Sequence, residues 1–183
     1  PLLWDTKPGL TTVAVENDSY AGLHHRRTVW FVDGKFFVLL DEAIGEKPGA
    51  LDLHFTFAPG DIEVNGDEHW AKTGFDDANV LVWQGPDAPV TVVEEDGWYA
   101  WTYGHRTPRK AIRFRHDAQA PAVYLTLVIP YRGTTTPDVR AALPQNFPVG
   151  AARVELDVEA AGQAYRLGRD LNEQKAWCNE ADQ

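Results

Sequence analysis

The sequence has no methionine, one serine and one cysteine, and it has no long apolar run. The lone Cys178 cannot form an internal disulfide, and a thiolate metal site needs more than one cysteine. Without methionine the chain has no initiator, so we expect it to be a piece of a longer precursor. No apolar run approaches the ~20 residues that span a bilayer, so we expect no transmembrane helix.

Positive charge is also scarce. The chain has 17 Lys and Arg against 27 Asp and Glu, a formal net charge of -10. Such a surface repels polyanions unless basic residues gather locally, so the composition predicts no nucleic-acid partner.

The pattern of apolar residues predicts an all-β protein. Helical periodicity is almost absent, and many short alternating or β-branched runs are separated by turn residues such as Pro59-Gly60 and Asn65-Gly66. This spacing is typical of an antiparallel β-sandwich or barrel. In Leu51 to Phe57 the alternation places His54 on the face opposite Leu53. The runs expected as strands are 12–16, 51–57, 80–83, 90–93, 98–101, 113–115, 123–129, 152–158 and 163–167.

The length of 183 residues suits one domain. We expect residues 1–171 to form the β-sandwich, with the last strands making a hairpin around Ala161-Gly162. Residues 172–183 are polar and are expected to be a tail that frays, with Cys178 as an ordinary thiol within it.

The segment from His24 to Asp41 is the most informative part of the chain. Asp33-Gly34 stands between two apolar and aromatic runs, which is the strongest short-range signal for a β-hairpin. A two-residue loop pairs Val32 with Lys35 and Arg26 with Asp41, whereas a three-residue loop shifts every pair by one. The loop length therefore decides which side chains share a face.

Two histidines and a carboxylate at the open end of this hairpin suggest a metal site. With the two-residue loop, His24 shares a face with Asp41, and His54 is a third possible ligand. Imidazole and carboxylate ligands suit Zn²⁺ better than Ca²⁺. With the three-residue loop, His25 replaces His24. A purely structural alternative is a cross-strand Arg26–Asp41 ion pair beside surface histidines.

A second cluster combines basic and aromatic residues. Basic groups beside aromatic rings suit an anionic sugar, whose ring faces stack and whose carboxylates or sulfates pair with arginine. The alternative is a strand with a solvated polar face and aromatics in the core. The cluster consists of Trp98, Tyr99, Trp101, Tyr103, His105, Arg106, Arg109, Lys110, Arg113, Arg115 and His116.

Several segments together resemble a known family. The stretch from His25 to Ala43, preceded by Glu16 to Tyr20, is similar to the C-terminal β-sandwich of heparinase II/III-type polysaccharide lyases, most of all the heparan-sulfate lyase (heparinase III) branch. Leu51 to Phe55 and Val123 to Tyr131 continue the likeness in the same order. The resemblance covers roughly residues 10–132, and its hairpin motif is the most specific part.

The resemblance implies that this chain is a fragment of a larger enzyme. Members have an N-terminal α/α toroid before the sandwich and cleave uronic-acid polysaccharides by β-elimination. Their catalytic Asn and Tyr lie in the toroid and their catalytic His lies upstream of the segment matching Pro1, so no catalytic residue is assigned here. Relatives also hold a structural metal in the sandwich through His and Asp, which favours His24, Asp41 and His54 as ligands.

The resemblance therefore predicts the C-terminal part of a periplasmic or secreted lyase that acts on an acidic glycosaminoglycan, with heparan sulfate as the expected substrate. The toroid is the expected partner domain, and the fragment alone is expected to be inactive. Two alternatives stay open. One is a non-catalytic sandwich that binds carbohydrate or braces a neighbouring domain, and the other is a lyase for alginate or another uronate polymer.

Overall fold

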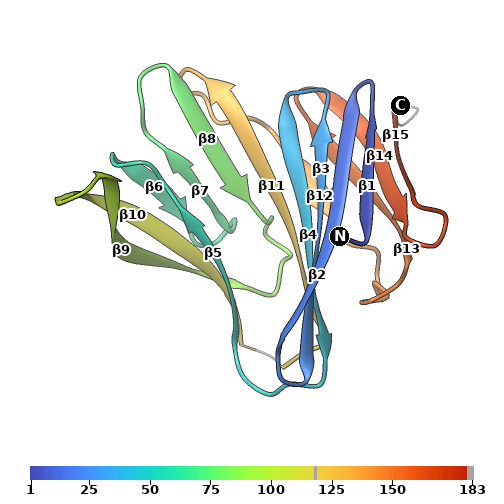
Figure 1. Ribbon diagram of the computed structural model, residues 1–183. Coiled ribbons are helices and arrows are strands. Elements are labelled where there is room, and N and C mark those ends of the chain that lie inside the picture. Colours follow the sequence, from blue (N-terminus) through green and yellow to red (C-terminus); the bar gives the residue numbers. More distant parts are fainter. Residues whose placement is uncertain (118, 181–183) are drawn as a thin grey trace.

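The computed structural model describes residues 1–117 and 119–180, and these residues form β-strands and loops (Figure 1). Within them no helix is long and apolar enough to cross a membrane. The all-β prediction is confirmed. The strands are β1 (Leu3–Lys7), β2 (Leu10–Tyr20), β3 (Leu23–Val32), β4 (Phe36–Gly45), β5 (Leu51–Thr56), β6 (Ile62–Asn65), β7 (Trp70–Thr73), β8 (Ala78–Trp83), β9 (Thr91–Thr102), β10 (His105–His116), β11 (Ala122–Arg132), β12 (Arg140–Ala142), β13 (Arg153–Ala160), β14 (Gln163–Asp170) and β15 (Lys175–Glu180).

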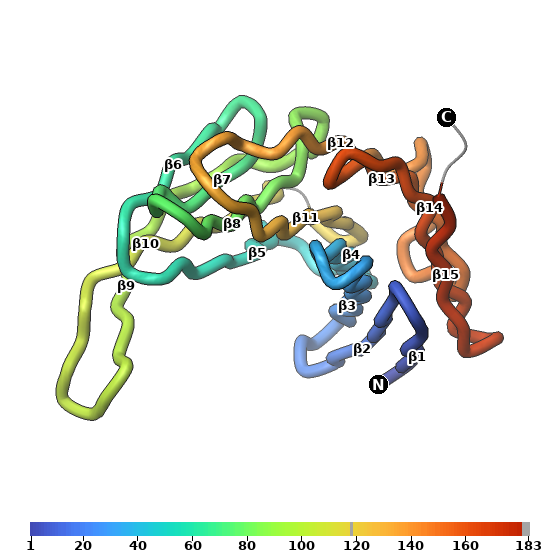
Figure 2. Tube along the Cα trace, turned by 90° about the horizontal axis from the view of Figure 1, so that it is seen from above, coloured from blue at the N-terminus to red at the C-terminus, as the bar shows by residue number. Residues whose placement is uncertain are grey.

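The strands build three antiparallel sheets. The central sheet has eight strands in the order β1-β2-β3-β4-β11-β8-β7-β6. A three-stranded sheet, β5-β10-β9, packs against one face, and a four-stranded sheet, β12-β13-β14-β15, packs against the other. Figure 2 shows the central sheet between the other two.

The main core lies between the central sheet and the β12–β15 sheet. Trp30, Leu40 and Leu127 point to this side and are fully buried. They pack with Leu156 and Leu167 of the opposing sheet. Apolar residues recur at every second position of β13, Val154, Leu156 and Val158, because a strand with one buried face alternates.

The second core lies between the central sheet and the β5-β10-β9 sheet. Val82 and Tyr124 of the central sheet pack there with Leu53 and Phe114. His54, next to Leu53 in β5, points away from this core, as the alternation in the sequence predicted.

Two boundaries differ from the sequence-based expectation. Residues 175–180, expected to belong to a fraying tail, form strand β15, which pairs with β14 from Asp170–Lys175 to Tyr165–Glu180. Residues 181–183 of the predicted tail lie outside the described part. The residues between the expected strands 90–93 and 98–101 do not interrupt the sheet: they belong to β9, with Gly97 opposite Arg109. In both segments, pairing with a neighbouring strand overrides weak local propensity.

Candidate functional site

The β3–β4 hairpin has a three-residue loop. Val32 pairs with Phe36, not with Lys35, and the shift by one continues along both strands. The backbone N–H of Asp33 donates to the carbonyl of Gly9 in the neighbouring β1–β2 turn, at 2.8 Å. This contact between hairpins is part of what fixes the loop, and it is not visible in the local sequence.

The register places His25, and not His24, beside Asp41. The imidazole Nε2 of His25 lies 2.6 Å from Oδ1 of Asp41. Arg27 Nε donates to the same oxygen at 2.7 Å, so the predicted Arg26–Asp41 pair is replaced by Arg27–Asp41. His24 lies opposite Ile44 on the other face. The prediction that His24 shares a face with Asp41 was therefore wrong, and the three-residue alternative is the one that the structure has.

Asp41 is unusual among the carboxylates of this chain. Its side chain is only 3% exposed, and its Oδ2 atom is buried without a hydrogen-bond partner among the described residues. Tyr124 is its cross-strand neighbour, and the hydroxyl of Tyr124 donates to the carbonyl of Leu51 at 2.6 Å. Burial raises the pKa of Tyr124, so the phenol stays neutral. A buried, unpaired carboxylate oxygen is costly, which marks Oδ2 as a position for a further ligand.

His54 does not join this group. Its Nδ1 lies 3.0 Å from Oε2 of Glu95, on the outer face of the β5-β10-β9 sheet, and Arg113 donates to Oε1 of the same glutamate. The predicted set of His24, Asp41 and His54 is thus spread over three surfaces and does not fit a three-ligand site. Within residues 1–117 and 119–180, no group of three or more His, Cys, Asp or Glu side chains is placed to hold a metal ion.

The basic and aromatic cluster lies on β9 and β10, and much of its charge is neutralised. Lys110 pairs with Glu94 and Asp96, each at 2.9 Å, and these hydrogen bonds raise its pKa. Arg113 and Arg115 pair with acidic neighbours in the same way. The basic character expected along the whole cluster is therefore confined to its distal part.

The aromatic residues of the cluster are exposed, contrary to the alternative that placed them in the core. Trp98 and Trp101 are 54% and 68% exposed, and Tyr103 is fully exposed. The guanidinium of Arg106 lies over the ring of Trp98, 4.4 Å from its centroid. Exposed aromatics in a group of this size are a signal for binding, because soluble proteins rarely leave them open to water.

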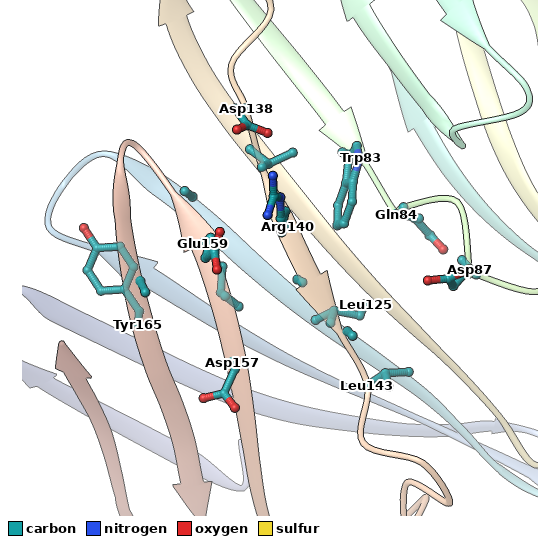
Figure 3. Close-up of a pocket in the computed structure, with 18 of the residues that line it drawn as sticks. Trp83, Gln84, Asp87, Leu125, Asp138, Arg140, Leu143, Asp157, Glu159 and Tyr165 are labelled. Carbon is teal, nitrogen blue, oxygen red and sulfur yellow. The ribbon is translucent and has the colours of Figure 1, made fainter. Parts of the chain in front are cut away.

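A cavity of about 1660 Å³ lies between the central sheet and β12–β13 (Figure 3), and the sequence did not predict it. Trp83 of β8, Arg140 of β12 and Glu159 of β13 are among its lining residues. These residues are far apart in the sequence, so no local motif could have indicated the cavity. Its lining mixes five acidic residues, two arginines and apolar groups.

Cys178, predicted to be an ordinary thiol, lies half-buried in β15. Burial, with Asp33 and Glu180 nearby, raises its pKa to about 11, so it carries no reactive thiolate at neutral pH.

Comparison with known proteins identifies the family of this chain. The model of the heparinase II/III-like C-terminal domain matches residues 3–148. A heparin-sulfate lyase from Bacteroides stercoris is 28% identical over 173 residues, which are 92% of this chain and 26% of that protein. A heparin-sulfate lyase from Bacteroides thetaiotaomicron is 30% identical over 179 residues, 92% of this chain and 25% of the relative.

Solved structures agree with the fold. A crystal structure of heparinase III superimposes with a TM-score of 0.81 at 26% identity, over 90% of this chain and 26% of the other. Heparan sulfate lyase HepC from Pedobacter heparinus gives a TM-score of 0.81 at 22% identity, over 98% of this chain and 28% of its own. The chain thus spans about a quarter of the length of these relatives. It belongs to the heparinase II/III-like C-terminal family.

Proposed function

We propose that this chain is the C-terminal sandwich portion of a polysaccharide lyase that cleaves a uronic-acid glycosaminoglycan by β-elimination. Heparan sulfate is the proposed substrate. The observation that carries the proposal is the family match over residues 3–148, together with relatives described as heparin-sulfate lyases along 92% of this chain. Such a substrate lies outside the cytoplasm, so we place the protein in the periplasm or outside the cell. Fractionation of the source cells would test that location.

The chemistry belongs, in this proposal, to other parts of the enzyme. β-Elimination needs a base for the C5 proton, a group that neutralises the uronate carboxylate, and an acid for the departing oxygen. The family resemblance assigns the catalytic Asn and Tyr to the toroid. This chain's part is to brace that domain and to present residues to the polysaccharide.

An uncovered apolar face of the central sheet is an argument for a large partner domain. The second core includes residues of β7, β8 and β11 but, among the described residues, none of β1 to β4. On that side Trp4 is 71% exposed, and Phe31 and Phe37 stack at 4.4 Å on a surface that neither outer sheet covers. Burial of such a face is favourable, which fits a domain packed against it in a longer protein.

We expect the 183-residue chain alone to release no unsaturated uronate from heparan sulfate, and the complete natural polypeptide to release it. The ultraviolet absorbance of the unsaturated product measures both. Alginate serves as the matched uronate polymer without sulfate, and faster release from alginate would favour the alternative lyase class. Product formation by the isolated chain would overturn the assignment of the chemistry to other parts of the enzyme.

We also propose that His25 and Asp41 bind the structural zinc expected for this family region, with water completing its shell. A histidine nitrogen and a carboxylate oxygen are suitable zinc ligands, and Oδ2 of Asp41 is buried without a hydrogen-bond partner in the described chain. His54 is held by Glu95 on another sheet and is not among the proposed ligands.

Elemental analysis of protein purified without chelator tests this assignment. The His25→Ala variant is expected to lose at least about nine-tenths of the bound zinc, since loss of a ligand weakens a site strongly. The His24→Ala and His54→Ala variants are matched controls and should keep it. Zinc lost from His54→Ala, or absent from every preparation, would contradict the proposal.

A further inference from the structure

The β9–β10 hairpin extends beyond the sheet to which it belongs. Strand β5 pairs with β10 only along residues 111–116, so the distal half of the hairpin has no third strand beside it. Figure 2 shows this half projecting away from the body of the molecule. We call residues 96–110 the arm. A two-stranded ribbon is at best marginally stable by itself. We therefore expect an arm of this length to have a role other than packing in the protein core.

The arm concentrates exposed aromatic surface. Trp98, Tyr99, Trp101 and Tyr103 occupy four of six successive positions, and all are more than two-fifths exposed. Their exposure costs hydrophobic free energy that an apolar partner surface would recover. The faces of pyranose rings, which carry C–H groups, are such a surface.

The arm also carries the cations that the rest of the cluster lacks. Neither Arg106 nor Arg109 has a carboxylate within ion-pair distance among the described residues, whereas Lys110 at the base of the arm is fully paired. The Nε of Arg109 is buried without a hydrogen-bond partner, beside a cavity of about 440 Å³ that Trp98 and Lys110 also line. In a chain with a net charge of -10, two arginines of the arm without carboxylate partners attract anions locally.

We propose that the arm is a binding site for a sulfated, uronate-containing polysaccharide. The exposed ring of Trp101 stacks on a sugar ring, and Arg106 and Arg109 pair with sulfate or carboxylate groups. Stacking on Trp98 fixes the guanidinium of Arg106 while its N–H groups remain in the plane and open to an anion. The choice of heparan sulfate as the glycan rests on the proposed function. The exposed aromatic rings and the arginines without carboxylate partners are what point to an anionic glycan.

The test is the affinity of the 183-residue chain for heparan sulfate, measured by titration calorimetry at low and at high salt. Trp101→Ala and Arg106→Ala are each expected to weaken binding about tenfold or more, and Trp101→Phe to retain it. Arg153→Ala is the matched control, because Arg153 also lies over an indole ring, that of Trp177, on the far sheet. This control removes the same charge and a similar ring contact and should bind like the unchanged chain.

Recognition through charge predicts that neutral dextran does not bind. It also predicts that heparan sulfate binds more weakly as salt rises, because salt screens the exposed charge of Arg106. Equal losses in Arg106→Ala and Arg153→Ala would overturn the proposal, since they would report net charge alone. Absence of binding at low salt would overturn it too and would favour a protein surface as the arm's partner. Neither result touches the proposed lyase, which is judged by product release from the complete polypeptide.

Discussion

Replacing Arg169 with Met is expected to lower the free energy of unfolding by about 3–5 kcal/mol, the usual cost of stranding a buried charge. The side chains of Arg169 and Glu42 are both fully buried, and they form an ion pair between β14 and β4. Burial lowers the pKa of Arg169, and the carboxylate of Glu42 opposes that shift. Removal of the guanidinium leaves the buried carboxyl group of Glu42 without its ion-pair partner.

The surrounding contacts explain why the loss is large. Arg169 also donates to the hydroxyl of Thr28 and to the backbone carbonyls of Ala151 and Ala152. Glu42 in turn accepts from the backbone N–H of Gly150 at 2.8 Å. The pair therefore ties the central sheet to the β12–β15 sheet and to the loop before β13. Its removal takes one hydrogen bond from Thr28, from Ala151, from Ala152 and from Glu42 at once.

Urea or thermal unfolding of the 183-residue chain measures this effect. For a domain of this size, the expected drop in Tm is roughly 6–20 °C. Arg166→Ala is the matched control, because Arg166 pairs with Asp157 on the exposed face of the same strand, at 2.8 Å. That variant should unfold close to the unchanged chain, since surface ion pairs contribute little. If the two variants were equally stable, the Glu42–Arg169 pair would not be what joins the sheets.

Gly168→Ala is expected to destabilise the chain by about 1–3 kcal/mol or more, through overpacking. A Cβ atom built on Gly168 lies 2.2 Å from the ring of Trp177 in β15, far inside contact distance. The indole is rigid and is also held by Arg153 over its face, so the ring must move together with its strand. The carbonyl of Gly168 meanwhile accepts from Nε1 of Trp30, at 3.2 Å, across the main core.

The same unfolding measurement applies, with tryptophan fluorescence as a local readout of Trp177. Gly66→Ala is the control, because a Cβ there meets nothing within 4 Å and its φ is not in the left-handed region. A Gly→Ala change at such a compatible position is neutral or stabilises by about 0.4–1 kcal/mol. A Gly168→Ala variant as stable as Gly66→Ala would show that β15 adapts without cost.

Local residue patterns were sufficient for much of the fold. Turn residues and alternation predicted the all-β class, the final hairpin around Ala161-Gly162 and the outward face of His54. These features depend on neighbours in the sequence, because side chains in a strand alternate with a period of two. The motif in the β3–β4 hairpin also pointed to the family that the comparisons show.

Features that depend on distant segments were not predicted. Strand β15 is polar in sequence and forms because β14 offers it a pairing edge. The pair of Glu42 and Arg169 joins residues separated by 127 positions, and no local signal connects them. The aromatic residues of the arm were recognised as a cluster, but their exposure and the neutralisation of Lys110 required the cross-strand register.

The sequence by itself determined the sheet class, the existence of the hairpin and the family. The tertiary structure alone decided which histidine joins Asp41. A one-residue difference in loop length reverses the face of every side chain in a strand, and that difference depends in part on a contact from the Asp33 N–H to Gly9 in a different hairpin. Local propensity specifies that a turn forms. The register of the strands that leave it is set by the rest of the sheet.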